Sequence, residues 1–99
     1  MRDVKQIRLS KMFVRDVQEE NEYRAKTNPD AVRDLKDRIN KRLEILIEFP
    51  QIGKFLDSKE GVELRMLIFE HHLILYRIDR DTVCVERYLD EKQDYQVYM

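Results

Sequence analysis

The residue types in this 99-residue chain that could do chemistry are arginine, lysine, tyrosine and the carboxylates. Metal-site patterns such as CxxC and HExxH are absent. His71 and His72 are adjacent, so in a strand their side chains point to opposite faces. Gly53 and Gly61 are isolated, which excludes a phosphate-binding glycine loop. We therefore expect no metal and no cofactor, and any catalysis would depend on proton transfer and electrostatic stabilisation.

The two histidines and the single cysteine have simple structural interpretations. We expect His71 and His72 at a hairpin turn, half exposed, with one histidine acting as a proton carrier as the alternative. Cys84 alternates with Val83 and Val85 in a strand-like stretch, which favours a small apolar packing residue over a nucleophile.

Composition indicates one globular domain over residues 1–99. The chain is 42% hydrophobic and 39% charged, against ~25% charged in an average domain. A net charge of −1 provides no bulk positive field, so a nucleic-acid role would need a local basic cluster or a macromolecular partner already bound. One cysteine excludes an internal disulfide, and no apolar run suits a signal peptide or a membrane helix. We expect a soluble cytoplasmic protein.

Two helices are expected in the first half of the chain. Residues 4–9 alternate weakly and predict a short strand, after which Ser10 offers an N-cap for a helix over residues 11–26. A second helix is expected over residues 29–49, with Asn28 as its cap. Its continuous apolar face consists of Val32, Leu35, Ile39, Leu43 and Leu46.

Three strands are expected after a loop over residues 50–61. The apolar period changes from 3.6 to two over residues 62–69, residues 72–78 are apolar nearly throughout, and residues 82–89 form the third strand. Their short connections predict an antiparallel meander. The order β-α-α-β-β-β predicts an α+β fold with two helices packed on one face of a small, mainly antiparallel sheet. The other face lacks a cover, which indicates a binding surface.

Four stretches of the chain, in this order, resemble the RelE/ParE toxin superfamily. Members typically carry P-x-x-G followed by Lys or Arg after a long second helix, then an L-R strand, a Y-R strand, and a strand ending in L-H-x-K/R-Q-D. The resemblance covers essentially the whole chain and agrees with the fold expected above. The matching stretches are E48-F-P-Q-I-G-K54, G61-V-E-L-R65, H72-L-I-L-Y-R-I-D79 and V83-C-V-E-R-Y-L-D-E-K-Q-D-Y95.

This resemblance implies a growth-inhibiting toxin of a type II toxin–antitoxin system, close to the ParE-like plasmid-stabilisation members. A cognate antitoxin would silence it by binding across the helix pair and the sheet edge, in a higher-order assembly of the kind common in the family. RelE-like members cut mRNA in the ribosomal A site, without a metal. ParE-like members stall DNA gyrase and are not enzymes, and a third alternative is a degenerate member that only forms the complex.

If the chain cleaves RNA, the resemblance assigns the catalytic roles to Arg65, Lys92 and Tyr98. Arg65 matches the L-R position, Lys92 the C-terminal basic residue, and Tyr98 the tyrosine that stacks on a base. Metal-free cleavage needs a base for the 2′-hydroxyl, cations for the phosphorane-like charge and an acid for the leaving oxygen. The residues expected to contact a target or substrate are Lys54, Arg77, Arg87, Asp90, Gln93 and Tyr95.

Purely structural roles remain an alternative for the arginines. Arg65 could pair with Glu63 or Glu86 across the sheet, and Arg77 could pair with a nearby aspartate. Ion pairs of this kind are common on protein surfaces and individually weak.

Two departures from the family pattern favour an action other than RNA cleavage. Asp90 stands where the family commonly has histidine, and the chain lacks the strong basic charge of the mRNA-cleaving members. Asp90, Glu91 and Asp94 surround Lys92, and that mixture suits a protein surface better than a phosphate backbone. We therefore expect ParE-like inhibition of DNA gyrase or of another protein target, with ribosome-dependent mRNA cleavage as the alternative.

Overall fold

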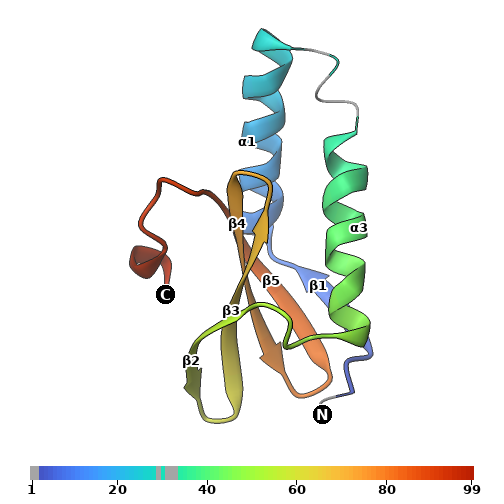
Figure 1. Cartoon of the computed structure of the whole chain (residues 1–99), viewed down its shortest axis with the longest axis vertical. Helices are drawn as coiled ribbons and strands as arrows, with labels where there is room; N and C mark the ends of the chain where they lie inside the picture. Colours follow the sequence, from blue (N-terminus) through green and yellow to red (C-terminus); the bar gives the residue numbers. More distant parts are fainter. Residues whose placement is uncertain (1–2, 29, 31–33) are drawn as a thin grey trace.

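Figure 1 shows two helices on one face of a five-stranded sheet, in a computed structural model that describes residues 3–28, 30 and 34–99. The sheet order is β1-β5-β4-β3-β2, with β1 parallel to β5 and the other three pairs antiparallel. The expected α+β fold is confirmed. The elements are β1 (Gln6–Leu9), α1 (Lys11–Thr27), α3 (Leu35–Glu48), β2 (Lys54–Lys59), β3 (Val62–Phe69), β4 (His72–Asp79), β5 (Thr82–Asp90) and the short 3-10 helix η1 (Tyr95–Tyr98).

The sheet contains one strand more than the sequence predicted. Residues 54–59, expected inside a loop, form β2, which pairs with β3 at the edge of the sheet. The pairing is interrupted by a bulge between Phe55 and Asp57. An edge strand with most of its side chains in solvent needs no alternation of apolar residues, so the polar sequence K-F-L-D-S-K carried no strand signal.

The helix predicted over residues 29–49 is broken near its start, since Asp30 is helical but Asp34 lies in a turn before α3. Asn28, the predicted cap, instead ends α1, where its N–H donates to the carbonyl of Arg24 at 2.7 Å. Asp34 lies in a turn and α3 starts at Leu35, because the chain must reverse direction between two antiparallel helices (Figure 1). The predicted first helical residue, Pro29, lies outside the described residues, as does Val32.

Ser10 joins the first strand, the first helix and the last strand. Its side-chain oxygen accepts a hydrogen bond from the N–H of Phe13 at 2.9 Å, which confirms the predicted N-cap of α1. The same hydroxyl donates to the carbonyl of Glu86 at 2.7 Å, and the Ser10 N–H donates to the carbonyl of Val85 at 2.9 Å. The start of α1 is thereby attached to β5 just beyond the end of β1.

The main core lies between the helices and the sheet. Phe13 and Val17 from α1 and Leu35, Ile39, Leu43 and Leu46 from α3 pack on the inward side chains of the strands. Tyr76 of β4 is fully buried there, and its hydroxyl donates to the carbonyl of Pro50 at 2.7 Å and accepts from the N–H of Gly53 at 2.9 Å. Gly53 is required for this approach, since a Cβ at that position would lie 2.6 Å from the Tyr76 hydroxyl and 2.8 Å from the carbonyl oxygen of Met66.

The opposite face of the sheet carries a second, smaller apolar cluster, which we call the tail-side cluster: Met66, Leu73, Leu75 and Leu89. The expectation that this face lacks a cover is wrong. The chain turns back after β5 (Figure 1). Tyr95 and Tyr98 of η1 pack on the cluster together with Leu56. The last residues of the chain therefore form part of the fold.

The adjacent histidines differ in burial. His71 lies in the turn between β3 and β4 with 84% of its side chain exposed, whereas His72 begins β4 and is buried. The prediction of a half-exposed pair is wrong for His72, because the ring of Tyr88 stacks on it and Glu20 of α1 lies beside its Nε2. Neither helix in the described part of the chain is long and apolar enough to cross a membrane.

Candidate functional site

A bulge in β5 directs two charged side chains onto the tail side of the sheet. Leu75 pairs with Arg87 and Tyr76 with Val85, so Glu86 is an extra residue without a partner across the strand pair. Arg87 shares the face of Leu75, a member of the tail-side cluster. Glu86 forms an ion pair with Arg77 at 3.5 Å.

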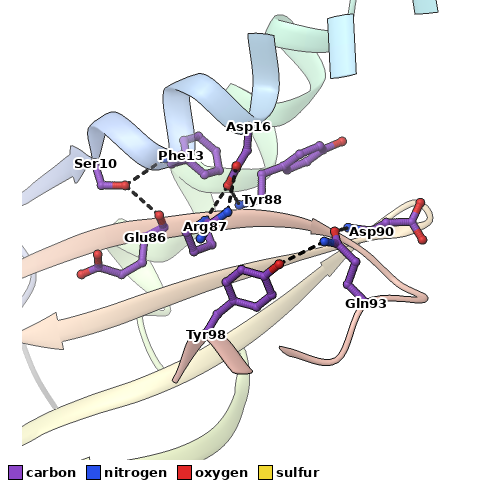
Figure 2. A network of polar contacts seen from close by, with 9 residues as sticks. All are labelled: Ser10, Phe13, Asp16, Glu86, Arg87, Tyr88, Asp90, Gln93 and Tyr98. Carbon is purple, nitrogen blue, oxygen red and sulfur yellow. Dashed lines mark hydrogen bonds and ion pairs between the residues drawn. The ribbon is translucent and has the colours of Figure 1, made fainter. Parts of the chain in front are cut away.

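Arg87 is held between α1 and the tail, as Figure 2 shows. Its Nε and one terminal nitrogen donate to the two carboxylate oxygens of Asp16 at 2.8 and 3.1 Å, a bidentate arrangement. The ring centroid of Tyr98 lies 4.5 Å from the guanidinium carbon. Asp16 also accepts the N–H of Tyr88 at 3.0 Å. The hydrogen bond to Asp16 raises the pKa of Arg87, so this side chain is a permanent cation.

Asp90 and Gln93 shape the turn that leads into the tail. The Asp90 carboxylate accepts the N–H of Lys92 at 2.9 Å, and the Asp90 N–H donates to the side-chain oxygen of Gln93 at 2.8 Å. The Gln93 amide nitrogen then donates to the hydroxyl of Tyr98 at 3.2 Å. The residue that stands where the family commonly has histidine is thus an Asx-turn residue in this chain.

Two open pockets lie on either side of the Arg87–Tyr98 stack, and both residues line both pockets. The first, of ≈ 370 Å³, also contains Asp16, Glu19 and Glu20 of α1, the end of β5 and Gln93. The second, of ≈ 610 Å³, contains the first turn of α1, Leu64, Leu75, Arg77, Glu86 and Val97. The two pockets therefore adjoin at the stack, between α1 and the tail.

Arg65 lies on the other face of the sheet and is occupied there. In the β3–β4 register it is opposite Tyr76, whose side chain is in the main core. One terminal nitrogen donates to the carbonyls of Gln51 and Gly53 at 3.0 and 2.7 Å, and the other pairs with Glu63 at 2.9 Å. This bears out the Glu63 pairing and gives Arg65 a structural role in holding the loop before β2.

The remaining predicted site residues are spread over the tail side. Lys54 is opposite Met66 in the sheet register and is exposed. Lys92 is exposed in the turn after β5, and Tyr95 packs on the tail-side cluster. The structure brings together Arg77, Arg87, Asp90, Gln93 and Tyr98, and it separates them from Arg65 by the thickness of the sheet.

The sequence did not indicate the residues that α1 contributes. Asp16 and the first turn of α1 line the site, yet no motif in the chain links them to β5, because 71 residues separate Asp16 from Arg87. The available signal was the Ser10 N-cap, which fixed the start of α1 and hence the face on which Asp16 lies.

A buried aromatic pair forms one wall of the first pocket. The rings of His72 and Tyr88 stack at a centroid distance of 4.5 Å, and His72 Nε2 lies 3.5 Å from a carboxylate oxygen of Glu20. The Tyr88 hydroxyl and His72 Nδ1 are buried without a hydrogen-bond partner among the described residues. Burial raises the pKa of Tyr88 well above its usual range, so its hydroxyl stays protonated.

The site can hold a ligand by ion pairing, hydrogen bonding and aromatic stacking. Within the described ranges, no three His, Cys, Asp or Glu side chains gather in a way that could hold a metal ion. Arg87 is already paired, and the acid and base that RNA cleavage needs are not placed together with Arg65. The site presents fixed charges and an aromatic ring in an open groove.

Comparisons with known proteins agree with the fold. A family model described as "ParE toxin of type II toxin-antitoxin system, parDE" matches residues 7–95. A search of the curated proteins found no match. One similar solved structure is a chain of the chromosomal ParDE system from P. aeruginosa, with 12% identity, a TM-score of 0.71, and coverage of 89% of this chain and 96% of that one. Another is from the archaeal RelE–RelB complex of Pyrococcus horikoshii OT3, with 13% identity, a TM-score of 0.64, and coverage of 92% and 99%.

Proposed function

Since the chain belongs to the family of ParE toxins of type II toxin–antitoxin systems, we propose that it arrests growth by binding a protein target, with DNA gyrase as the favoured one. The observation that carries this proposal is the position of Arg65. The best candidate for stabilising charge on a scissile phosphate faces the main core and holds the loop before β2, away from Tyr98 and Lys92. A surface that only binds a protein target does not require Arg65, Lys92 and Tyr98 to lie together.

The charges around Tyr98 support the same proposal. Glu19, Glu20 and Asp90 line the first pocket, where a phosphate backbone would need cations. The positive charge of Arg87, the nearest cation, is compensated by its bidentate ion pair with Asp16. A protein surface carries both signs of charge and can complement this mixture.

RelE-like cleavage of mRNA on the ribosome is the second candidate function. The observation in its favour is the stack of Tyr98 on Arg87, because an aromatic ring beside a cation is a platform on which a base can stack. On this alternative Lys54, Arg77 and Lys92 would supply the remaining positive charge near the RNA.

We also propose that a cognate antitoxin binds the helix side of the molecule. An apolar pocket of ≈ 240 Å³ lies between α1 and α3, lined by Phe13, Val17 and Ile39 together with the exposed Leu9 and Val14. An amphipathic helix of a partner can place apolar side chains in such a groove. The neighbouring β1 is an edge strand, which a partner strand can extend.

The experiment that tests the toxin activity is induction of the chain alone in bacteria. We expect growth arrest, loss of gyrase supercoiling activity when the purified chain is added, and no new cuts in cellular mRNA by primer extension. Co-induction with the antitoxin is the control and should restore growth. Codon-phased mRNA cuts with unchanged gyrase activity would contradict the proposal and establish the second candidate.

A further inference from the structure

The two pockets beside the Arg87–Tyr98 stack form one groove between α1 and the C-terminal tail, which we call the α1–tail groove. One wall is α1 from Lys11 to Glu20, and the other is formed by the tail. At ~1.5 Å of rise per helical residue, this stretch of α1 is about 15 Å long. An extended chain of four or five residues, at ~3.3 Å each, spans that length.

The two ends of this groove carry opposite charge. At the end near the start of α1, Lys11 and Arg77 face one carboxylate, Glu86, which leaves a positive excess. At the other end Glu19, Glu20 and Asp90 leave a negative excess, even though Glu20 is paired with Arg24 at 2.8 Å. Lys11 and Glu19 are both exposed and form no ion pair within the described part of the chain.

The middle of the groove is apolar and held in place. Leu75, opposite Arg87 in the sheet register, lies beside the stack, and Leu64, opposite Arg77, lies towards the Lys11 end. Met12 and Val97, which also line this part, are 43% and 77% exposed. The Tyr98 ring crosses the groove and is fixed on one side by Arg87 and on the other by the hydrogen bond from Gln93. A preorganised aromatic side chain of this kind provides contact area with little further loss of conformational entropy.

We propose that the α1–tail groove binds an extended segment of the target protein, with an acidic residue at the Lys11 end, basic residues at the Glu19 end and an apolar residue against Tyr98. Charge complementarity along the groove carries this inference. Single-stranded RNA fits less well, because its phosphates are negative along the whole length and one end of the groove is acidic. The inference rests on the proposed function, since it takes the target to be a protein.

The direct test uses two pentapeptides of the same composition with blocked ends, titrated into the purified full-length chain and followed by NMR. In Asp-Leu-Phe-Lys-Arg the charges are segregated, and in Lys-Leu-Asp-Phe-Arg they are interspersed. A five-nucleotide oligouridylate is the third probe. We expect the segregated peptide to bind at least five-fold more tightly than the interspersed one, with shifts in residues 10–20 and 86–98, and the oligouridylate to bind more weakly than either.

A charge-swap variant separates this inference from general electrostatics. Lys11→Glu combined with Glu19→Lys leaves the net charge unchanged but mixes the signs at each end, so the preference between the peptides should fall to about one. Arg15→Glu combined with Glu22→Lys changes two exposed residues of α1 outside the groove and should keep the preference. Circular dichroism checks that both variants fold.

Three results would overturn the inference: equal binding of the two peptides by the unmodified chain, tighter binding of the oligouridylate, or an unchanged preference in the charge-swap variant. A parallel supercoiling assay distinguishes its failure from failure of the proposed function. If the unmodified chain and the charge-swap variant inhibit gyrase equally, the groove inference fails and the function stands. If neither protein inhibits gyrase, while the unmodified chain prefers the segregated peptide and the charge-swap variant does not, gyrase fails as the target and the groove inference stands.

Discussion

Two buried tyrosines of the sheet use their hydroxyls differently. Tyr76 donates to the carbonyl of Pro50 and accepts from the N–H of Gly53, so its hydroxyl attaches the loop before β2 to the core. The Tyr88 hydroxyl is equally enclosed but has no hydrogen-bond partner among the described residues. A buried polar group without a partner costs about 1–3 kcal/mol, while a satisfied one contributes about 1 kcal/mol. The two hydroxyls should therefore have opposite effects on stability.

We expect Tyr88→Phe to raise the free energy of unfolding by up to about 1 kcal/mol, because it removes a hydroxyl that is desolvated without compensation. Tyr76→Phe is the matched control and should lower it by about 1–3 kcal/mol, since it leaves the Pro50 carbonyl and the Gly53 N–H buried and unpaired. Urea denaturation at pH 7 measures both. A destabilised Tyr88→Phe variant would show that the hydroxyl has a partner in solution.

Tyr76 and Tyr88 also determine how the free energy of unfolding changes at alkaline pH. Burial raises the pKa of Tyr88 and of Tyr76 in the folded chain above the value of 10.0 for an unperturbed tyrosine. The folded state therefore holds the two phenolic protons more tightly than the unfolded state does. This contribution to the free energy of unfolding is fully present below about pH 10 and is lost as the pH rises towards the pKa values of the folded chain. Tyr88→Phe should lose less stability than the unmodified chain between pH 10 and 11.

At the scale of the elements, the C-terminal tail covers part of the sheet face opposite the helices. Tyr95 and Tyr98 cover the tail-side cluster, Asp94 caps η1 by accepting the N–H of Gln96 at 3.1 Å, and Arg87 stacks on Tyr98. These contacts are few, and most of the tail is exposed. The tail should therefore open more readily than the strands beneath it.

Tyr98→Ala should lower the free energy of unfolding by about 1–2 kcal/mol, because it removes both the apolar contact with the cluster and the stack on Arg87. Val97→Ala is the matched control, since Val97 is 77% exposed, and should change stability by less than about 0.5 kcal/mol. Urea denaturation gives both values. Hydrogen exchange should show faster exchange of residues 90–99 in the Tyr98 variant alone, and equal exchange in the two variants would refute the anchoring role.

The sequence predicted α1 from its N-cap, α3 and β3 from their apolar periods, and β4 from its apolar run. The tail as part of the target surface stays a prediction from resemblance. The sequence missed β2, whose side chains lie mostly in solvent, and the late start of α3, which is set by the reversal between two helices. It could not show that Arg65 and Tyr98 lie on opposite faces, because the face of each residue depends on register. Asp16 could not be identified from the sequence, because its contact with Arg87 is a tertiary contact between residues far apart in the chain.

For the whole molecule, the sheet separates two surfaces with different proposed partners. The helix side offers the apolar pocket between α1 and α3 and the open edge of β1, which suit an antitoxin. The tail side offers the α1–tail groove, which suits a target. α1 contributes to both, so an antitoxin that moves α1 also moves Asp16 and hence Arg87.

If the antitoxin binds the helix side and the target binds the tail side, binding of the antitoxin should slow hydrogen exchange in β1, α1 and α3. The physical reason is that a helix in the apolar pocket and a strand on the edge of β1 exclude water from those backbone groups. The measurement compares exchange of the chain with and without antitoxin, with residues 54–69 of β2 and β3 as the internal control, which should be unchanged. Protection confined to the tail and β2 would refute the assignment of the antitoxin to the helix side.

The shortness of β1 has a consequence for the order in which the protein is made. β1 pairs with only the first part of β5, and Ser10 and Asp16 close the rest of that strand by side-chain contacts. The N-terminal strand and helices leave the ribosome first, yet the strand that they cover is synthesised last. At a synthesis rate of ~5–20 residues per second, the apolar side chains of α1 have no β5 to pack on for several seconds, until residue 90 has been added. The edge of β1 that the proposed antitoxin would extend therefore forms only when β5 is complete, at the same stage as the strand that carries Arg87.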